Sequence, residues 1–65
     1  MKMDKIKFIC ELARRNMSIK QVAEKSGVTR NTISAIKNGK SCTPATAGRI
    51  AKALELDVTD IFTVN

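Results

Sequence analysis

A short stretch of the chain carries four side chains whose types suit contacts with the edges of DNA bases: Arg30, Asn31, Ser34 and Ala35. Arg and Asn can each form paired hydrogen bonds, with guanine and adenine respectively, and a Ser hydroxyl can bond to either kind of base. The small apolar side chain of Ala can contact the methyl group of thymine. These residues predict base recognition, provided that one structural element presents them together.

The element predicted to present them is the second of two short helices within residues 18–39. Ser18 and Gln21 have the spacing of a capping box at the start of the first helix. Gly27 suits a tight turn that needs a positive φ. Thr29 is expected to cap the second helix, which should stop at Asn38 and Gly39.

Three residues at fixed offsets predict the angle between these two helices. Ala23 is small enough for the helices to lie close together, Gly27 follows at the turn, and Ile33 can fill the angle. This pattern is typical of a helix-turn-helix, in which the second helix presents its N-terminal end to the major groove. With Ile33 and Ile36 buried, the four base-reading candidates and Lys37 point outward or sideways.

Helical periodicity also covers the rest of the chain. A first helix is expected from a cap at Asp4 to about Asn16, with its buried stripe at i, i+3, i+4 and i+7: Ile6, Ile9, Cys10 and Ala13. A fourth helix is expected to begin at Thr43 and Pro44. Its buried residues should be Ala47, Ile50, Ala51 and Leu54.

A last short turn, capped by Thr59, is expected to carry Ile61 and Phe62. No strand-like alternation extends over four or more residues. The sequence therefore predicts an all-α fold of about five short helices, forming a single domain over residues 1–65.

The charge balance indicates an anionic partner. Twelve Lys and Arg residues against six Asp and Glu residues give a net charge of +6, and residues 1–40 carry ten of the basic and three of the acidic residues. No acidic residue lies between Lys25 and Lys40. A positive field concentrated in one half of the chain favours nucleic acid as the partner, although net charge serves solubility equally well.

Catalysis, metal binding and membrane insertion find little support in this sequence. There is no His, and a chain of 65 residues has too small a core to enclose a water-free pocket. No apolar run approaches the roughly 18 residues of a membrane span, and residues 1–10 lack the core of a signal peptide. We therefore predict a cytoplasmic protein that is not an enzyme and has no metal, cofactor or small-molecule ligand.

The two cysteines, Cys10 and Cys42, do not form a CxxC pair. Cys10 is expected to be a small core residue and Cys42 to lie in a loop. In a cytoplasmic protein both should be reduced thiols, with a disulfide between them as the minor alternative.

From Phe8 to Phe62 the sequence resembles the Cro and phage-repressor family of helix-turn-helix regulators, often called Xre-like. The resemblance is carried by Ser18 to Ser34, Ile36, Asn38-Gly39-Lys40, Pro44 and Ile50-Ala51-Lys52-Ala53-Leu54. It implies a compact five-helix domain of the lambda-repressor type that binds operator DNA, usually as a two-fold dimer.

The resemblance also assigns roles to individual residues. It implies that Arg30, Asn31 and Ala35 read bases, and Ser34 beside them completes the predicted base-reading set. Hydroxyls, amides, basic side chains and helix N-termini suit phosphate. The predicted phosphate contacts are Ser18, Lys20, Thr29, Thr32, Lys37, Asn38, Lys40 and Thr43.

The sequence departs from the family pattern in three respects. Ile19 stands where the family commonly has a Gln that grips the DNA backbone, a contact that Ile cannot make. Leu12 and Lys37 stand where many members pair an Arg with a Glu, which leaves Lys37 for phosphate or for packing its stem on Leu12. Asp57 stands where Gly or Asn often ends the fourth helix, so a positive φ is expected there.

The predicted dimer interface is the apolar C-terminal segment: Val58, Ile61, Phe62 and Val64. The alternative is that Ile61 and Phe62 close the chain's own core, which we expect for at least one of them. The acidic residues Glu55, Asp57 and Asp60 should keep this end of the molecule away from DNA.

The sequence as a whole predicts a double-stranded DNA-binding transcriptional regulator, a repressor or Cro-type switch protein that binds an inverted-repeat operator as a dimer. One alternative is a protein-interaction module, such as an antitoxin or antirepressor, that uses the same fold. Binding of RNA or single strands usually needs aromatic stacking platforms. Phe8 and Phe62, the two aromatic residues, lie outside the basic region.

Overall fold

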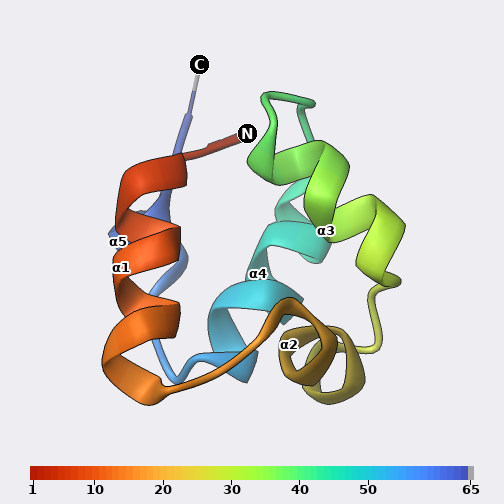
Figure 1. The fold of residues 1–65 in the computed structure, drawn as a ribbon. Helices are drawn as coiled ribbons and strands as arrows, with labels where there is room; N and C mark the ends of the chain where they lie inside the picture. Colours follow the sequence, from red (N-terminus) through yellow and green to blue (C-terminus); the bar gives the residue numbers. More distant parts are fainter. Residues whose placement is uncertain (65) are drawn as a thin grey trace.

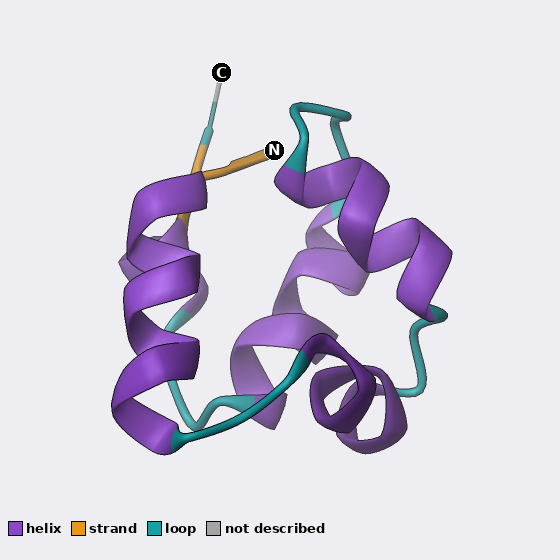
Figure 2. Cartoon of the chain, viewed as in Figure 1, coloured by secondary structure: helices purple, strands orange, loops and turns teal. Residues whose placement is uncertain are grey.

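The computed structural model of the chain describes residues 1–64, which form five α-helices joined by short loops (Figure 1). The helices are α1 (Lys5–Arg15), α2 (Ile19–Ser26), α3 (Arg30–Lys37), α4 (Pro44–Ala53) and α5 (Val58–Ile61). Two strands of two residues each, β1 (Lys2–Met3) and β2 (Phe62–Thr63), complete the fold (Figure 2). The described part is compact, with a Cα radius of gyration of 10.1 Å. The predicted all-helical class is confirmed.

Polar side chains set the beginnings of the first four helices, as the sequence predicts. The side chain of Asp4 accepts a hydrogen bond from the Lys7 amide, and Ser18 forms a complete capping box with Gln21. Thr29 and Thr43 cap α3 and α4, where their hydroxyls accept backbone N–H groups of the first helical turn. These bonds satisfy amides that the helix itself leaves without a partner.

One apolar core joins the helices, with α4 at its centre. The predicted stripe of α4 is buried throughout, and α4 packs against both α2 and α5. Twelve buried residues form the core: Phe8, Leu12, Val22, Val28, Ile33, Ile36, Ala47, Ile50, Ala51, Leu54, Ile61 and Phe62. None of the buried residues among positions 1–64 is polar or charged.

The predicted buried stripe of the first helix is wrong. Ile6, Ile9, Cys10 and Ala13 are all exposed, and the core instead receives Phe8 and Leu12. Residues two apart project to nearly opposite sides of a helix, so burial of Phe8 turns Ile6 towards solvent. The large Phe8 ring and the i, i+4 spacing of Phe8 and Leu12 outweigh the longer run of smaller apolar residues.

Both cysteines are free thiols, so the disulfide alternative is absent from this structure. Cys10 lies on the exposed side of α1, which corrects its assignment to the core. Cys42 is half-buried in the loop before α4, and its burial raises the pKa of the thiol.

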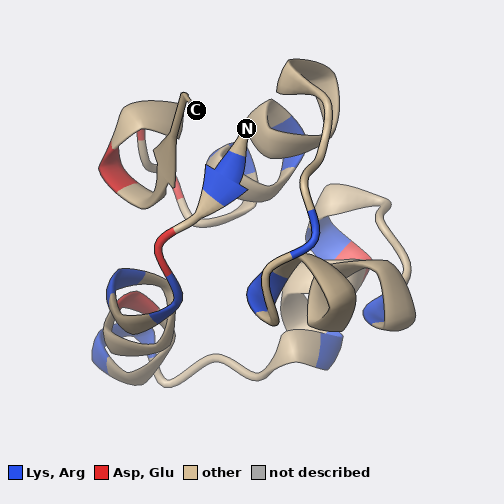
Figure 3. Ribbon diagram, turned by 90° about the horizontal axis from the view of Figure 1, so that it is seen from above, with Lys and Arg blue, Asp and Glu red and all other residues tan. Residues whose placement is uncertain are grey.

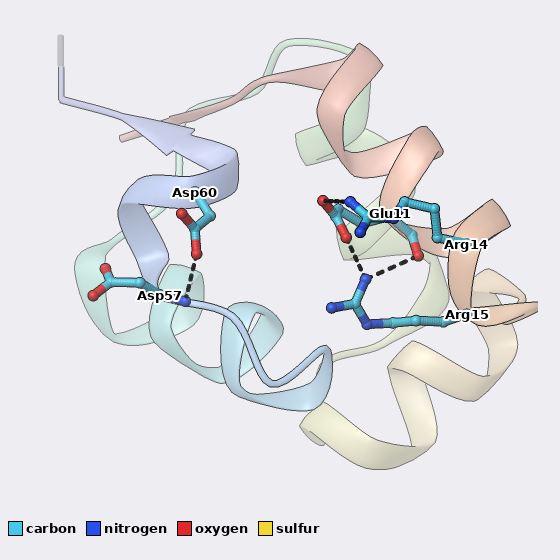
Figure 4. A network of polar contacts seen from close by, with 5 residues as sticks. All are labelled: Glu11, Arg14, Arg15, Asp57 and Asp60. Carbon is cyan, nitrogen blue, oxygen red and sulfur yellow. Dashed lines mark hydrogen bonds and ion pairs between the residues drawn. The ribbon is translucent and has the colours of Figure 1, made fainter.

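The start of α5 also differs from the prediction. Its N-cap is Asp57 and not Thr59, and Asp57 has an ordinary φ of −72°. Thr59 donates its amide and its hydroxyl to Asp57 Oδ1, both at 3.0 Å. The Asp57 amide donates to Asp60 Oδ2 (Figure 4). The hydrogen bond from the Thr59 amide lowers the pKa of Asp57. The positive φ, of 58°, belongs instead to Glu55.

The two short strands were not predicted from the sequence. β1 and β2 pair antiparallel, with Lys2 opposite Thr63 and Met3 opposite Phe62. The Asp4 amide extends this seam by donating to the carbonyl of Ile61 at 2.7 Å. Strands of two residues are too short to show the alternation by which strands are identified.

Candidate nucleic-acid interface

The turn between α2 and α3 has the geometry of a helix-turn-helix. Gly27 ends α2 in the left-handed region, with φ 75°, and its amide donates to the carbonyl of Ala23 at 2.9 Å. Val28 enters the core, and its amide donates to Ser26 Oγ at 3.2 Å. Thr29 then caps α3. The turn is therefore ordered by backbone conformation, by burial and by local hydrogen bonds.

The orientation of α3 agrees with its predicted buried pair. Ile33 and Ile36 are both buried in the core. Arg30 and Asn31, in the first turn of α3, are exposed. The other two base-reading candidates, Ser34 and Ala35, are half-buried. The leading end of α3 is therefore free of cover from the chain itself.

The hydroxyl groups at the start of α3 are arranged as a pair. Thr29 Oγ1 accepts from the Thr32 amide at 3.2 Å and donates its own proton to Thr32 Oγ1 at 2.8 Å. A hydroxyl has one proton and two lone pairs. One hydroxyl proton is used within the pair, so the Thr29–Thr32 pair keeps one hydroxyl proton available for a phosphate oxygen.

The same arrangement recurs at the start of α4. Thr43 Oγ1 accepts from the Thr46 amide at 3.2 Å and donates to Thr46 Oγ1 at 3.1 Å. Thr46 is thus a candidate phosphate donor that the sequence prediction missed. The repeated Thr-x-x-Thr spacing, at residues 29–32 and 43–46, was the available signal.

The remaining phosphate candidates lie at or near the surface. Ser18 is the exposed N-cap of α2, and Lys20, two residues later in the first turn of the helix, is exposed as well. Asn38, the C-cap of α3, and Lys40 are exposed, whereas Lys37 is half-buried. Ile19, which replaces the Gln of the family pattern, is half-buried against the core.

Electrostatics favour an anion at α3. Within residues 1–64 the ion pairs are confined to α1, where Glu11 binds Arg14, at 3.2 Å, and Arg15 (Figure 4). The Arg15 hydrogen bond lowers the pKa of Glu11. The basic side chains of α2 and α3, Lys20, Lys25, Arg30 and Lys37, have no carboxylate within ion-pair distance among the described residues. Helix α5, which contains Asp60 and is capped by Asp57, lies on the other side of the molecule from α3 (Figures 1 and 3).

A second group of basic residues lies between the end of α2 and α4. Lys25, Arg49 and Lys52 line an open hollow with Ser26, Ala53 and Glu55. Lys25 and Arg49 are far apart in the sequence, so periodicity alone could not bring them together. The carboxylate of Glu55 gives this hollow a mixed charge.

The C-terminal residues predicted to form a dimer interface separate into two groups. Ile61 and Phe62 are 0% and 2% exposed, because both side chains close the chain's own core. They have no free surface for a partner, which corrects their assignment to the interface and confirms the alternative that they close the core. Val58 is half-buried, and Val64 is 80% exposed.

The comparisons with known proteins place this geometry in a family. A family model described as "Helix-turn-helix" matches residues 6–61, which is most of the chain. The chain therefore belongs to this helix-turn-helix family, of the Cro and phage-repressor (Xre-like) type, which is a family of DNA-binding domains. No curated protein and no solved structure matches the chain. Within residues 1–64, no helix has the length and apolarity to cross a membrane.

Proposed function

We propose that this chain is a sequence-specific regulator of transcription, of the repressor or Cro-switch kind, that binds an inverted-repeat operator as a homodimer. In this proposal residues 1–65 form one cytoplasmic DNA-binding domain with no enzymatic activity and no small-molecule ligand. The observation that carries it is the exposed leading end of α3, where Arg30 and Asn31 are free of partners from the described chain. Both side chains are of the types that read bases through paired hydrogen bonds.

In the proposed complex the first turn of α3 enters the major groove. Arg30 and Asn31 contact base edges, and Ser34 and Ala35, which are half-buried, contribute from the next turn. The phosphates on either side are bound at the N-termini of α2, α3 and α4 by Ser18, Thr32 and Thr46. Amides and hydroxyls at helix N-termini suit an anion because the helix dipole favours negative charge there.

A dimer would supply the affinity that one small domain lacks. Two copies related by a two-fold axis would place their α3 helices about 34 Å apart, which is one turn of B-DNA. Because Ile61 and Phe62 are buried, the proposed interface uses Val64 and the exposed part of Val58. Sedimentation of the protein with and without DNA tests this step, and a monomer under both conditions at high micromolar concentration would contradict it.

The DNA proposal is tested by selecting bound duplexes from a random library. We expect the selected sequences to share an inverted repeat with half-sites one helical turn apart. If a dimer contacts six to ten phosphates, the affinity should fall about 10³–10⁵-fold between 50 and 200 mM salt. Selected duplexes without a shared sequence would contradict specific recognition.

One observation favours a second candidate function. Ile6 is 68% exposed and Ile9 is 42% exposed, so α1 presents apolar side chains to solvent. A protein-interaction module, such as an antitoxin or antirepressor with this fold, would use such a surface and would bind DNA weakly and with little dependence on salt. The same DNA titration therefore separates the two candidates.

A further inference from the structure

The outward face of α1 is an apolar stripe that covers no part of the chain's own core. It consists of Ile6, Ile9, Cys10 and Ala13, which we call the α1 stripe; all four residues are exposed. Their i, i+3, i+4, i+7 spacing puts them on one side of the helix. Contiguous exposed apolar patches on small proteins often mark sites of interaction.

Basic side chains border the α1 stripe on both edges. At 100° per residue, Lys7 and Arg14 lie along the edge next to Cys10, and Lys5 lies along the edge next to Ile9. Lys5 and Lys7 are exposed and have no carboxylate within ion-pair distance in residues 1–64. The helix has one acidic residue, Glu11, which is held by Arg14 and Arg15 (Figure 4).

These charges oppose a second copy of the chain as the occupant. Two α1 helices packed on each other would bring Lys5, Lys7 and Arg14 of one copy against the same cations of the other. Like charges placed opposite one another oppose association.

We propose that the α1 stripe docks an amphipathic helix of a different protein, with apolar residues on its contact face and Asp or Glu along both edges. The apolar side chains would pack on Ile6 and Ile9, and the carboxylates along the two edges would pair with the free cations Lys5 and Lys7. The partner helix would use apolar anchors at i, i+3, i+4 and i+7, as amphipathic helices do when they bind an apolar surface. The inference goes beyond DNA binding, because α1 and α3 lie on opposite sides of the molecule (Figures 1 and 3).

The test uses a fluorescent synthetic peptide with Leu at i, i+3, i+4 and i+7 and Glu at the positions that flank them. Fluorescence anisotropy should show that the protein binds this peptide at least about tenfold more tightly than a matched peptide with Lys in place of each Glu. Added salt should weaken the binding. Equal affinity for the two peptides would overturn the proposal.

Two variants of α1 localise the site. Replacing Ile6→Asp and Ile9→Asp together should weaken binding of the Glu peptide at least about tenfold, whereas Ala45→Asp, a change at an exposed apolar residue of α4, should leave it unchanged. Undiminished binding by the double variant would contradict the site. The charge reversal Lys5→Glu with Lys7→Glu should lower the affinity for the Glu peptide and raise that for the Lys peptide, a crossover that misfolding cannot produce.

Two further measurements separate the other outcomes. If the protein alone sediments as a dimer and Ile9→Asp makes it monomeric, the occupant is a second copy and the acidic partner is wrong. DNA affinity measured on the Ile6→Asp and Ile9→Asp double variant should match that of the unchanged protein. A large loss of DNA affinity there would overturn the assignment of separate surfaces, and peptide binding by a protein that fails to bind DNA would overturn the proposed function alone.

Discussion

Helices α1 and α3 contribute equally to the core, but they expose different kinds of side chain to solvent. Each has two side chains in the core, Phe8 and Leu12 in α1 and Ile33 and Ile36 in α3. Their outward faces are opposite in character, since α3 presents polar and basic groups and α1 presents the α1 stripe. The same fold thus exposes one face suited to an anion and another suited to an apolar surface.

This difference shows how a domain of this size can present a polar surface on α3 and a separate apolar surface on α1. A polar face can stay hydrated when no partner is bound, so α3 exposes Arg30 and Asn31 at little cost. Exposed Ile6 and Ile9 leave apolar area in water that a partner could cover, at about 25 cal/mol per Å². The four predictions that follow test this contrast, beginning with the largest expected effect.

Substitutions on the buried and exposed faces of α1 should differ most in their effect on the stability of the protein. Phe8→Ala should lower the free energy of unfolding by about 3–5 kcal/mol, because it empties a buried site in the core. Ile6→Ala should change it by less than about 0.5 kcal/mol, because Ile6 is exposed. Urea denaturation followed by circular dichroism measures both values, and Phe8→Leu gives an intermediate variant if Phe8→Ala does not fold. Equal losses would place Ile6 in the core.

Arg30, on the outward face of α3, should affect the sequence preference of DNA binding, whereas Lys40, which follows α3, should affect only its strength. Arg30→Ala should relax the base preference at one operator position, with a loss of about 1–3 kcal/mol of discrimination. Lys40→Ala should weaken binding to all duplexes by a similar factor, because a phosphate contact carries no sequence information. Competition titrations with single-base operator variants measure both effects. An equal loss of affinity for every operator variant on Arg30→Ala would contradict the placement of Arg30 in the major groove.

Substitution of Gly27, in the turn before α3, and of Gly48, inside α4, should have opposite effects on stability. Neither Gly27 nor Gly48 has an atom within 4 Å of an added Cβ, but Gly27 has a φ of 75°. Gly27→Ala should therefore destabilise the protein by about 1–2 kcal/mol. Gly48→Ala should stabilise it by about 0.5–1 kcal/mol, because Ala favours a helix interior. Thermal denaturation of the two variants should move Tm in opposite directions, and a shift in the same direction would refute the backbone explanation.

The smallest expected effect is the dependence of stability on acidic pH, to which Glu11 of α1 contributes. The Arg15 hydrogen bond lowers the pKa of Glu11 in the folded protein, so its contribution to stability is present above the unfolded pKa, about 4.3. That contribution is lost as the pH falls through the lower folded pKa. The Tm curves of the unchanged protein and Glu11→Gln should therefore converge on acidification. Asn31→Ala is the control from α3, which has no carboxylate, and its difference from the unchanged protein should stay constant with pH.

The contrast between α1 and α3 also explains what the sequence could predict. In α3 only Ile33 and Ile36 form an apolar pair, so the buried face follows directly and the outward residues follow from it. The caps at Asp4, Ser18 and Thr29 are equally local, and the structure confirms them. Features defined by neighbouring residues were therefore predictable.

Most of the errors arose where the outcome depends on distant parts of the chain; the N-cap of α5, expected at Thr59 and found at Asp57, is a local exception. In α1 two apolar stripes competed, and only packing against the assembled core selects Phe8 and Leu12. The burial of Phe62 and the pairing of β1 with β2 join opposite ends of the sequence. The roles of Thr32 and Thr46 depend on which hydroxyl donates to the other, which residue type alone does not specify.

The β1–β2 seam has a consequence for the order of folding. It and α5 attach α1 to the rest of the molecule through contacts between residues some sixty positions apart, such as Lys2 with Thr63. Contacts of that separation close a long loop, whereas α2, α3 and α4 meet over short separations. We expect α1 to dock after the folding barrier has been crossed, so that Phe8→Leu speeds unfolding and leaves the folding rate almost unchanged in a chevron plot. The α1 stripe would then be the last surface to form and the first to be lost.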